Sequence, residues 1–120
     1  MTGLDPDGVG HIDLYSCFPS AVQVGAESLG FGEDRQLTET GGLTFAGGPL
    51  NNYVTHSIAT MIERLRDDAG AVGLVSANGG FLTKHAVGLY STEPPEAGWQ
   101  WEDVQAAVDA VPETPYAEDH

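Results

Sequence analysis

The chain contains 120 residues, with four Lys or Arg against eighteen Asp or Glu, which gives a formal net charge of -14 at pH 7. Such a surface repels the phosphates of nucleic acids and of anionic membranes, so the composition argues against both classes of partner. The length suits one domain with a modest hydrophobic core. The single cysteine, Cys17, rules out an internal disulfide framework and suits a reducing compartment.

The sequence shows no membrane or export signal. No apolar run approaches the roughly 18 residues that cross a bilayer, and residues 1–7 lack the basic region of a signal peptide. We therefore expect a cytoplasmic protein without a membrane span. The acidity is uneven, because residues 93–120 hold eight carboxylates and no Lys or Arg.

The first part of the chain predicts one strand and one short helix. A strand is expected over residues 10–16, where His11 and Asp13 interrupt the apolar residues. A helix is expected over residues 19–29, because it begins at a proline and is followed by glycines. Residues 33–40 are polar and indicate a connection.

A glycine-rich loop at residues 41–48 and an amphipathic helix over residues 49–66 form the centre of the sequence. Pro49 suits a first helical turn, where its missing N–H has no partner to lose. The apolar face repeats with helical spacing at Leu50, Tyr53, Val54, Ser57, Ile58, Met61, Ile62 and Leu65. The loop would place backbone N–H groups and the positive end of the helix dipole where a negative or carbonyl-bearing group binds. The glycines alone slightly favour the alternative, a tight loop with helix caps.

A hairpin follows the long helix. Strands are predicted over residues 71–77 and 83–90, with Asn78-Gly79-Gly80 as the turn, because Asn and Gly accept positive φ at low cost. The three predicted strands form the core of an α/β fold, and the helix over 49–66 packs across them. Residues 99–111 can form a further helix.

We divide the chain at residue 92. Residues 1–92 form the structured region, and residues 93–120 form an acidic linker or tail with a short helix. Trp99 and Trp101 are interpreted as docking aromatics in that tail. The final segment after Pro112 is expected to be frayed or part of a linker.

Three segments resemble parts of the thiolase superfamily, in the order and spacing of that family. Residues 13–18 resemble the strand end at which sterol-carrier-type, actinobacterial thiolase-like proteins carry His-Asp-Cys-Phe. Residues 41–50 resemble the Gly-Gly…Gly-His-Pro-Leu loop, and residues 77–80 resemble the Cys-x-Gly-Gly hairpin. The resemblance spans residues 10 to 92 and implies the C-terminal part of an acetyl-CoA acetyltransferase-like protein. It implies helices on one face of the sheet, with a second, similar half covering the rest.

The departures from the family bear on catalysis. A thiolase uses a nucleophilic cysteine in its N-terminal half, the histidine of Gly-His-Pro and the cysteine of Cys-x-Gly. The N-terminal half has no counterpart in these 120 residues, the histidine position is Gly48, and the cysteine position is Ala77, or Asn78 after a shift of one place. None of these side chains transfers a proton at pH 7. We therefore expect an acyltransferase-family chain that does not carry out thiolysis on its own.

Two residues are candidates for catalysis. Cys17 follows a predicted strand end, where sites gather in α/β sheets, although a free cysteine is commonly a small buried hydrophobe. His85 lies in the return strand of the hairpin and is the better acid or base, unless it is a surface histidine. His56 lies off the apolar face and is expected in solvent. These residues are too dispersed for a metal site, so no metal is predicted.

The candidate substrate-binding residues come from the glycine loop, the helix start and the hairpin. They are Gly47, Gly48, Pro49, Asn51, Asn52, Asn78 and Gly79. Asn51 and Asn52 could bind a substrate carbonyl or cap the loop. No cofactor is expected, and a coenzyme A thioester is the substrate that the resemblance implies.

Two classes of function stay open. The chain is part of an acyl-CoA enzyme of lipid metabolism, including a retro-aldolase, whose pocket a thiolase N-terminal half or another chain completes. Alternatively, it is a non-catalytic module that binds acyl-CoA, lipid or protein. The isolated chain would expose an apolar helix or sheet face, which indicates such a partner or a homo-oligomer.

Overall fold

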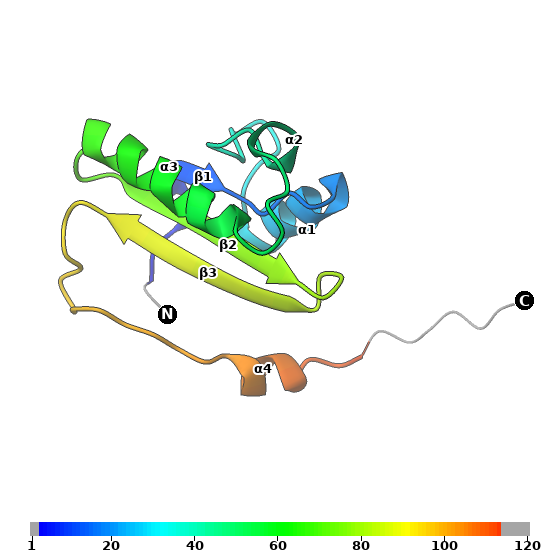
Figure 1. Ribbon diagram of the computed structural model, residues 1–120. Helices are drawn as coiled ribbons and strands as arrows, with labels where there is room; N and C mark the ends of the chain where they lie inside the picture. The colour runs from blue at the N-terminus through cyan, green and yellow to red at the C-terminus, as the bar shows by residue number, and fades with distance from the viewer. Residues whose placement is uncertain (1–2, 114–120) are drawn as a thin grey trace, which may run out of the picture.

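A three-stranded sheet with a helix on each face forms the centre of the molecule. The computed structural model describes residues 3–113, and Figure 1 shows the strands in the order β1-β2-β3. β1 (His11–Asp13) pairs in parallel with β2 (Val72–Gly79), which pairs antiparallel with β3 (Lys84–Ser91). The predicted α/β class and all three strands are confirmed, with bounds that differ by a few residues. A 3-10 turn, η1 (Pro6–Gly8), precedes β1.

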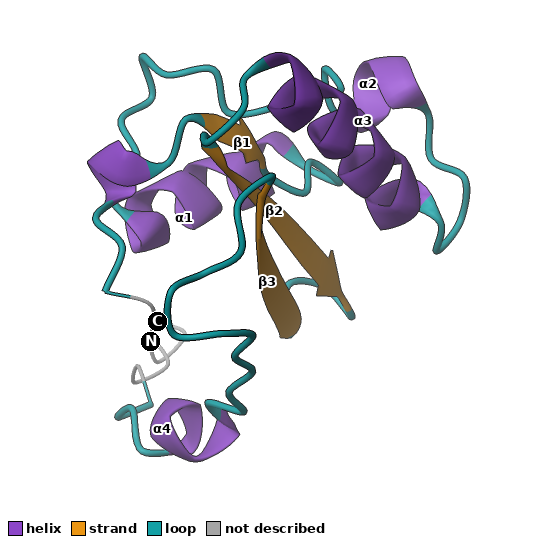
Figure 2. Ribbon diagram, turned by 90° about the vertical axis from the view of Figure 1, so that its left-hand side faces the viewer, coloured by secondary structure: helices purple, strands orange, loops and turns teal. Residues whose placement is uncertain are grey.

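The two longer helices lie on opposite faces of this sheet. α1 (Pro19–Leu29) covers one face and α3 (Tyr53–Asp67) covers the other, as the view along the sheet in Figure 2 shows. The expectation that helices cover a single face is therefore wrong for this part of the fold. The cause lies in β2, where the neighbours Leu74 and Val75 point to opposite faces and are both buried.

Each helix closes its own hydrophobic cluster against the sheet. On the α1 side, the buried members are Val9, Ile12, Leu14, Ala26, Phe31 and Leu74. On the α3 side, they are Met61, Leu65 and Val75, with Val54, Ile58, Ala71 and Tyr90 packed around them. The helical spacing predicted for α3 therefore identifies most of the α3 residues that pack against the sheet.

The start of α3 is four residues later than the sequence predicts. Pro49 and Asn51 lie in a loop, and Asn52 is the residue before the first turn. Leu50 has a φ of +53° and is 90% exposed, so it belongs neither to the helix nor to its apolar face. The loop is closed by its own bonds, since the Leu50 N–H donates to the Gly48 carbonyl at 2.7 Å. A four-residue helix, α2 (Leu43–Ala46), lies between the two glycine pairs.

The hairpin turn is also displaced from its predicted place. Asn78 and Gly79 belong to β2 and pair with His85 and Lys84, so the turn occupies residues 80–83. Gly80, Phe81 and Leu82 have positive φ values there, at +59°, +56° and +65°. The Thr83 side chain and backbone N–H bond back to Gly80 and Gly79, which closes the turn without Asn78.

The segment after β3 is exposed along its described length, residues 92–113. Its helix, α4 (Gln105–Asp109), is much shorter than the predicted helix over 99–111, because no other element buries its apolar residues. Figure 1 shows it running apart from the sheet. Residues 114–120 of the predicted acidic tail lie outside the described residues. Among the described residues, no helix combines the length and apolar character that a bilayer crossing requires.

We predict that Gly73→Ala destabilises the fold by about 1–3 kcal/mol, because the core at this point is already filled. Gly73 of β2 faces α3, and a Cβ there would overlap Met61 Sδ and lie 2.9 Å from its Cγ. Met61 is fully buried, so its side chain would have to shift within the core. Urea unfolding measures the change. Gly10→Ala is the matched control, since its Cβ would meet Ala71 at an ordinary 3.6 Å. Equal stability of the two variants would contradict this account.

Candidate functional site at the end of the first strand

A buried carboxylate organises the end of β1. Asp13 Oδ1 accepts from the backbone N–H groups of Glu39, at 2.8 Å, and Thr40, at 3.0 Å, and from the Thr40 hydroxyl at 3.0 Å. Asp13 Oδ2 accepts from the hydroxyls of Tyr53, at 3.1 Å, and Ser57. Two backbone N–H groups and three hydroxyls therefore take the place of water around a fully buried group. They join β1 to the connection before α2 and to α3.

Tyr53 completes this network from the first turn of α3. Its hydroxyl lies 2.6 Å from Thr40 Oγ1, and its ring meets Tyr15 edge to face with centroids 5.2 Å apart. Burial, together with the charge of Asp13, raises the pKa of Tyr53 above its usual 10.0, whereas the Thr40 bond opposes this shift. Tyr53 consequently stays a neutral hydroxyl that can donate to the carboxylate.

The three segments that carry the thiolase resemblance meet just beyond Asp13. The Tyr15 N–H donates to Ser76 Oγ of β2 at 2.9 Å. Ser16 Oγ accepts from the Leu43 N–H, at the start of α2, at 3.0 Å. Cys17 Sγ lies 3.5 Å from Asn78 Oδ1. The strand-end segment therefore contacts both the hairpin and the glycine loop.

Gly42 permits the close approach of the glycine loop to the strand end. Its φ is +74°, and a Cβ there would overlap Ser16 Oγ and lie 3.2 Å from Ser16 Cβ. A larger residue would separate the loop from the Ser16 hydroxyl. The glycine pair at 41–42 thus has a packing role that the sequence did not reveal.

Cys17, Asn78 and His85 follow one another across the sheet end. Asn78 contacts the Cys17 thiol and faces His85 directly in the β2–β3 register. His85 is exposed, and its Nε2 lies 2.7 Å from the Leu82 carbonyl. An amide cannot take up a proton, so the neighbour that the structure gives Cys17 does not activate it as a nucleophile. An open depression of about 230 Å³ lies along the hairpin, lined by Ala77, Asn78, Gly79, Lys84, His85 and Ala86.

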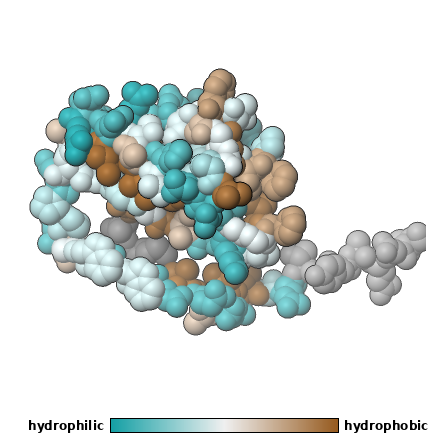
Figure 3. Space-filling view, in the orientation of Figure 1, coloured by the Kyte–Doolittle hydropathy of each residue, from teal (hydrophilic) through white to brown (hydrophobic). Residues whose placement is uncertain are grey.

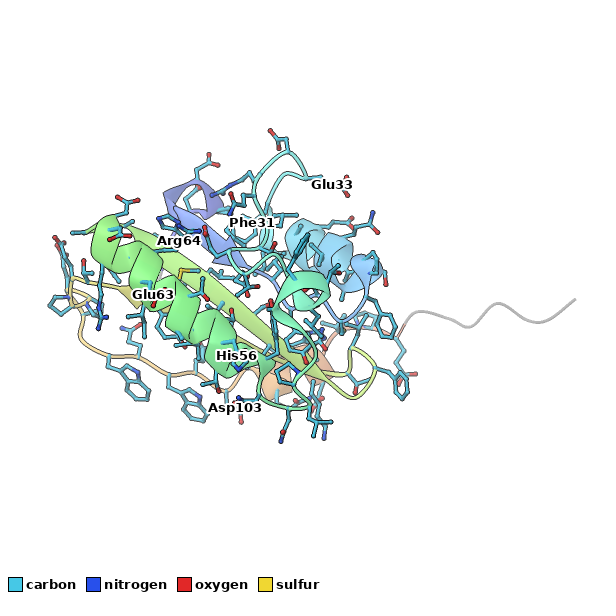
Figure 4. All side chains as sticks on the ribbon, turned by 45° about the horizontal axis from the view of Figure 1, so that its top comes forward. Phe31, Glu33, His56, Glu63, Arg64 and Asp103 are labelled. Carbon is cyan, nitrogen blue, oxygen red and sulfur yellow. The ribbon has the colours of Figure 1, made fainter. Side chains whose placement is uncertain are left out.

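The glycine loop does not end on the long helix. Gly47 and Gly48 follow α2, and α3 begins only at Tyr53, so the expected helix start at Pro49 beside the glycine loop is wrong. The Leu50 N–H is already bonded to the Gly48 carbonyl. The Asn52 side-chain nitrogen lies 3.3 Å from His56 Nε2. Figure 4 shows His56 at this end of α3, in solvent as predicted.

Sequence reasoning missed the site's central residue. Asp13 was interpreted as an interruption of an apolar strand, and Ser57 as a member of an apolar face. The available signal was the helical spacing of Tyr53 and Ser57, which places two hydroxyls together on the face that packs against the sheet. Within residues 3–113, no three His, Cys, Asp or Glu side chains converge as metal ligands would.

One solved structure has a similar fold over nearly the whole chain. It is a monomeric SCP2-thiolase-like protein type 1 (STLP1) from Mycobacterium smegmatis, with 43% sequence identity and a TM-score of 0.81. The alignment covers 98% of this chain. The chain is thiolase-like and of the sterol-carrier type. It spans only 27% of the STLP1 chain. No protein-family model matches the sequence, and no curated protein matches it significantly.

The match confirms the thiolase-like resemblance and its fold. It does not assign a role to any candidate residue, so Cys17, His85 and the loop residues remain predictions. The thiolase-like strand end nonetheless has a defined local chemistry. It brings together the buried carboxylate of Asp13, the half-buried thiol of Cys17 and the primary amide of Asn78.

We predict that Asp13→Asn destabilises this thiolase-like fold by about 3 kcal/mol, because an amide nitrogen would face donors that now bond to a carboxylate oxygen. Urea unfolding near neutral pH measures the loss. The exposed Asp34 provides the control, since Asp34→Asn should leave the unfolding midpoint almost unchanged. If Asp13→Asn behaved like the control, the carboxylate would not hold β1 in place.

Proposed function

We propose that this chain contributes one part of the binding site for an acyl-CoA thioester in a thiolase-like protein. The observation that carries the proposal is the meeting of three thiolase-like segments around residues 15–17, through the bonds to Ser76, Leu43 and Asn78. The match to STLP1 supports the family, and a thioester is the substrate class that the resemblance implies.

The proposed role is binding, without thiolysis by the chain on its own. Gly48 and Ala77 occupy the positions of the family's acid and base residues and carry no titratable group. Cys17 lies beside the amide of Asn78, which cannot serve as its base. This arrangement favours a binding module, or half of a site whose reactive groups come from elsewhere.

The proposed ligand contacts lie on the glycine loop and the hairpin. No atom lies within 4 Å of the place where a Cβ on Gly47, Gly48 or Gly79 would stand, so a ligand can reach the backbone there. Asn51 and Asn52 are exposed on the same loop as Gly48, and their amides can donate to a thioester carbonyl. The formal net charge of -14 disfavours contact with the CoA phosphates, so we propose that they lie away from this chain or against basic residues of a partner.

The site is proposed to be completed by the rest of a thiolase-like protein, corresponding to its N-terminal half, with a second copy of this chain as the alternative. STLP1 is monomeric and this chain spans 27% of it, so the counterpart of this fold there adjoins further segments of one chain. Phe81 at the hairpin turn is 94% exposed. Figure 3 shows apolar side chains on the surface toward the end where α1 and α2 lie. Such side chains are commonly covered in an assembly.

We predict that the purified chain does not cleave acetoacetyl-CoA in the presence of coenzyme A, because it lacks an acid and a base at the family's positions. The decrease in enolate absorbance of the substrate measures cleavage. Cleavage above the buffer rate that disappeared in Cys17→Ala would show that the chain is catalytic and would overturn this part of the proposal.

We predict that Gly48→Val weakens binding of acetoacetyl-CoA at least about tenfold, because a β-branched side chain would fill the space beside the loop backbone. Calorimetry measures the affinity, with the chain produced together with the part of STLP1 that it does not span. Ala59→Val on the exposed face of α3 is the matched control. Unchanged affinity in Gly48→Val would exclude this loop, whereas an assembly that bound no acyl-CoA at all would exclude the substrate class.

A further inference from the structure

His11 of β1 lies between two carboxylates from different parts of the chain. Its Nδ1 is 3.0 Å from Glu39 Oε1, in the connection before α2, and its Nε2 is 3.0 Å from Asp68 Oδ2, just after α3. Arg64 of α3 reaches the other oxygen of Glu39, with Nε 3.0 Å from Oε2. Figure 4 shows Arg64 on the side of α3 that faces this connection. The four side chains form one continuous charged chain.

This geometry requires both ring nitrogens of His11 to carry protons. Ionised carboxylates accept hydrogen bonds and donate none, and a neutral imidazole has a single N–H. In the neutral ring, one nitrogen lone pair would face a carboxylate oxygen of Glu39 or Asp68 at 3.0 Å. The imidazolium form satisfies both contacts with charge-assisted bonds.

We propose that His11, Glu39, Arg64 and Asp68 form a proton-dependent clamp that joins β1, the connection before α2 and the C-terminal end of α3. With His11 protonated, the clamp bridges residues 28 and 57 positions apart in the sequence. When His11 loses its proton, the bond to Asp68 or to Glu39 is lost, and Glu39 retains Arg64.

The remaining charged and polar groups around His11 are already engaged. An open depression of about 570 Å³ beside the clamp is lined by Gly10, His11, Arg35, Gln36, Glu39 and Arg64. Arg35 donates to the carbonyls of Pro6, at 3.0 Å, and Val9. Gln36 lies 3.4 Å from Glu39 Oε2, and Asp13, on the same strand, accepts from the Glu39 N–H. Glu39 and Asp68 are thus the acceptors that respond to the proton on His11.

The electrostatic surroundings also favour the protonated form of His11. The hydrogen bond with Glu39 raises the pKa of His11 above its usual 6.5, partial burial opposes this, and Asp68 adds to the rise. A raised pKa in the folded state means that the clamp stabilises the fold fully below the unfolded value of 6.5. This contribution is lost as the pH rises through the folded value. Because the Glu39 N–H also bonds to Asp13, the loss reaches the segment that leads into the glycine loop.

Nitrogen NMR of the imidazole rings tests the protonation state directly in the full chain. We expect both nitrogens of His11 to be protonated at about pH 6.5, where a free imidazole is half ionised, and we expect Asp68→Asn to lower its pKa. The exposed His56 serves as the internal reference in the same spectra. A His11 that titrates at or below the reference, or that shows one protonated nitrogen at that pH, would overturn the clamp.

Urea unfolding tests the energetic consequence. Between about pH 6 and about pH 9, the wild-type midpoint should fall relative to that of His11→Gln, because only the wild type loses a bridging proton. His56→Gln is the matched control and should follow the wild type at every pH. If His11→Gln does not fold, Asp68→Asn carries the test, since it keeps the imidazole and Glu39. Parallel pH profiles for the wild type and the available clamp variant would refute the proposal.

Discussion

The fold depends on a negative charge that has no access to water. Asp13 ends the shortest strand of the sheet. Only three residues of β1 pair with β2, so the ladder alone would hold β1 weakly. The bonds from Glu39, Thr40, Tyr53 and Ser57 add a second attachment on the α3 side. Desolvating a carboxylate is costly, so the arrangement is stable only when its donors are in place together. Because the donors must all be present around Asp13, they hold the connection before α2, the first turns of α3 and the end of β1 in one relative arrangement.

The sequence predicted the elements whose signal is periodic and local. The apolar spacing from Tyr53 to Leu65 identified the buried face of α3, and the apolar run at 71–77 identified most of β2. It failed at Leu50, which fits the helical period but adopts positive φ in a loop, because a period contains no information about where a chain leaves the helix. It failed again at Asn78-Gly79, because extended pairing with β3 outweighed the turn propensity of the pair. The role of Asp13 was not predictable from alternation alone, since its donors come from residues 26 to 44 positions away.

In the thiolase-like site, too, local features were predictable from the sequence and contacts between distant residues were not. The motif segments could be recognised one by one, and their resemblance led to the correct family. The contacts between these segments could not be recognised from the sequence. They are made by the hydroxyls of Ser16 and Ser76, which accept hydrogen bonds from backbone N–H groups of distant segments. The chemistry left at the site is that of hydrogen bonding, with a thiol beside an amide at Cys17 and Asn78. For the proposed binding of a carbonyl compound, these groups would supply hydrogen bonds, and proton transfer would have to come from groups outside these residues.

The parallel pairing of β1 with β2 has a consequence for how the chain folds. His11 and Gly73, the first partners in that ladder, are separated by 62 positions in the sequence, whereas β2 and β3 are joined by a turn at residues 80–83. Closing a long loop costs more entropy than closing a short one, and contacts between distant residues form late for that reason. α3, β2 and β3 are consecutive and can assemble first as a helix on a hairpin. In that order, β1 would join a preformed sheet edge, and the burial of the Asp13 carboxylate would be a late step.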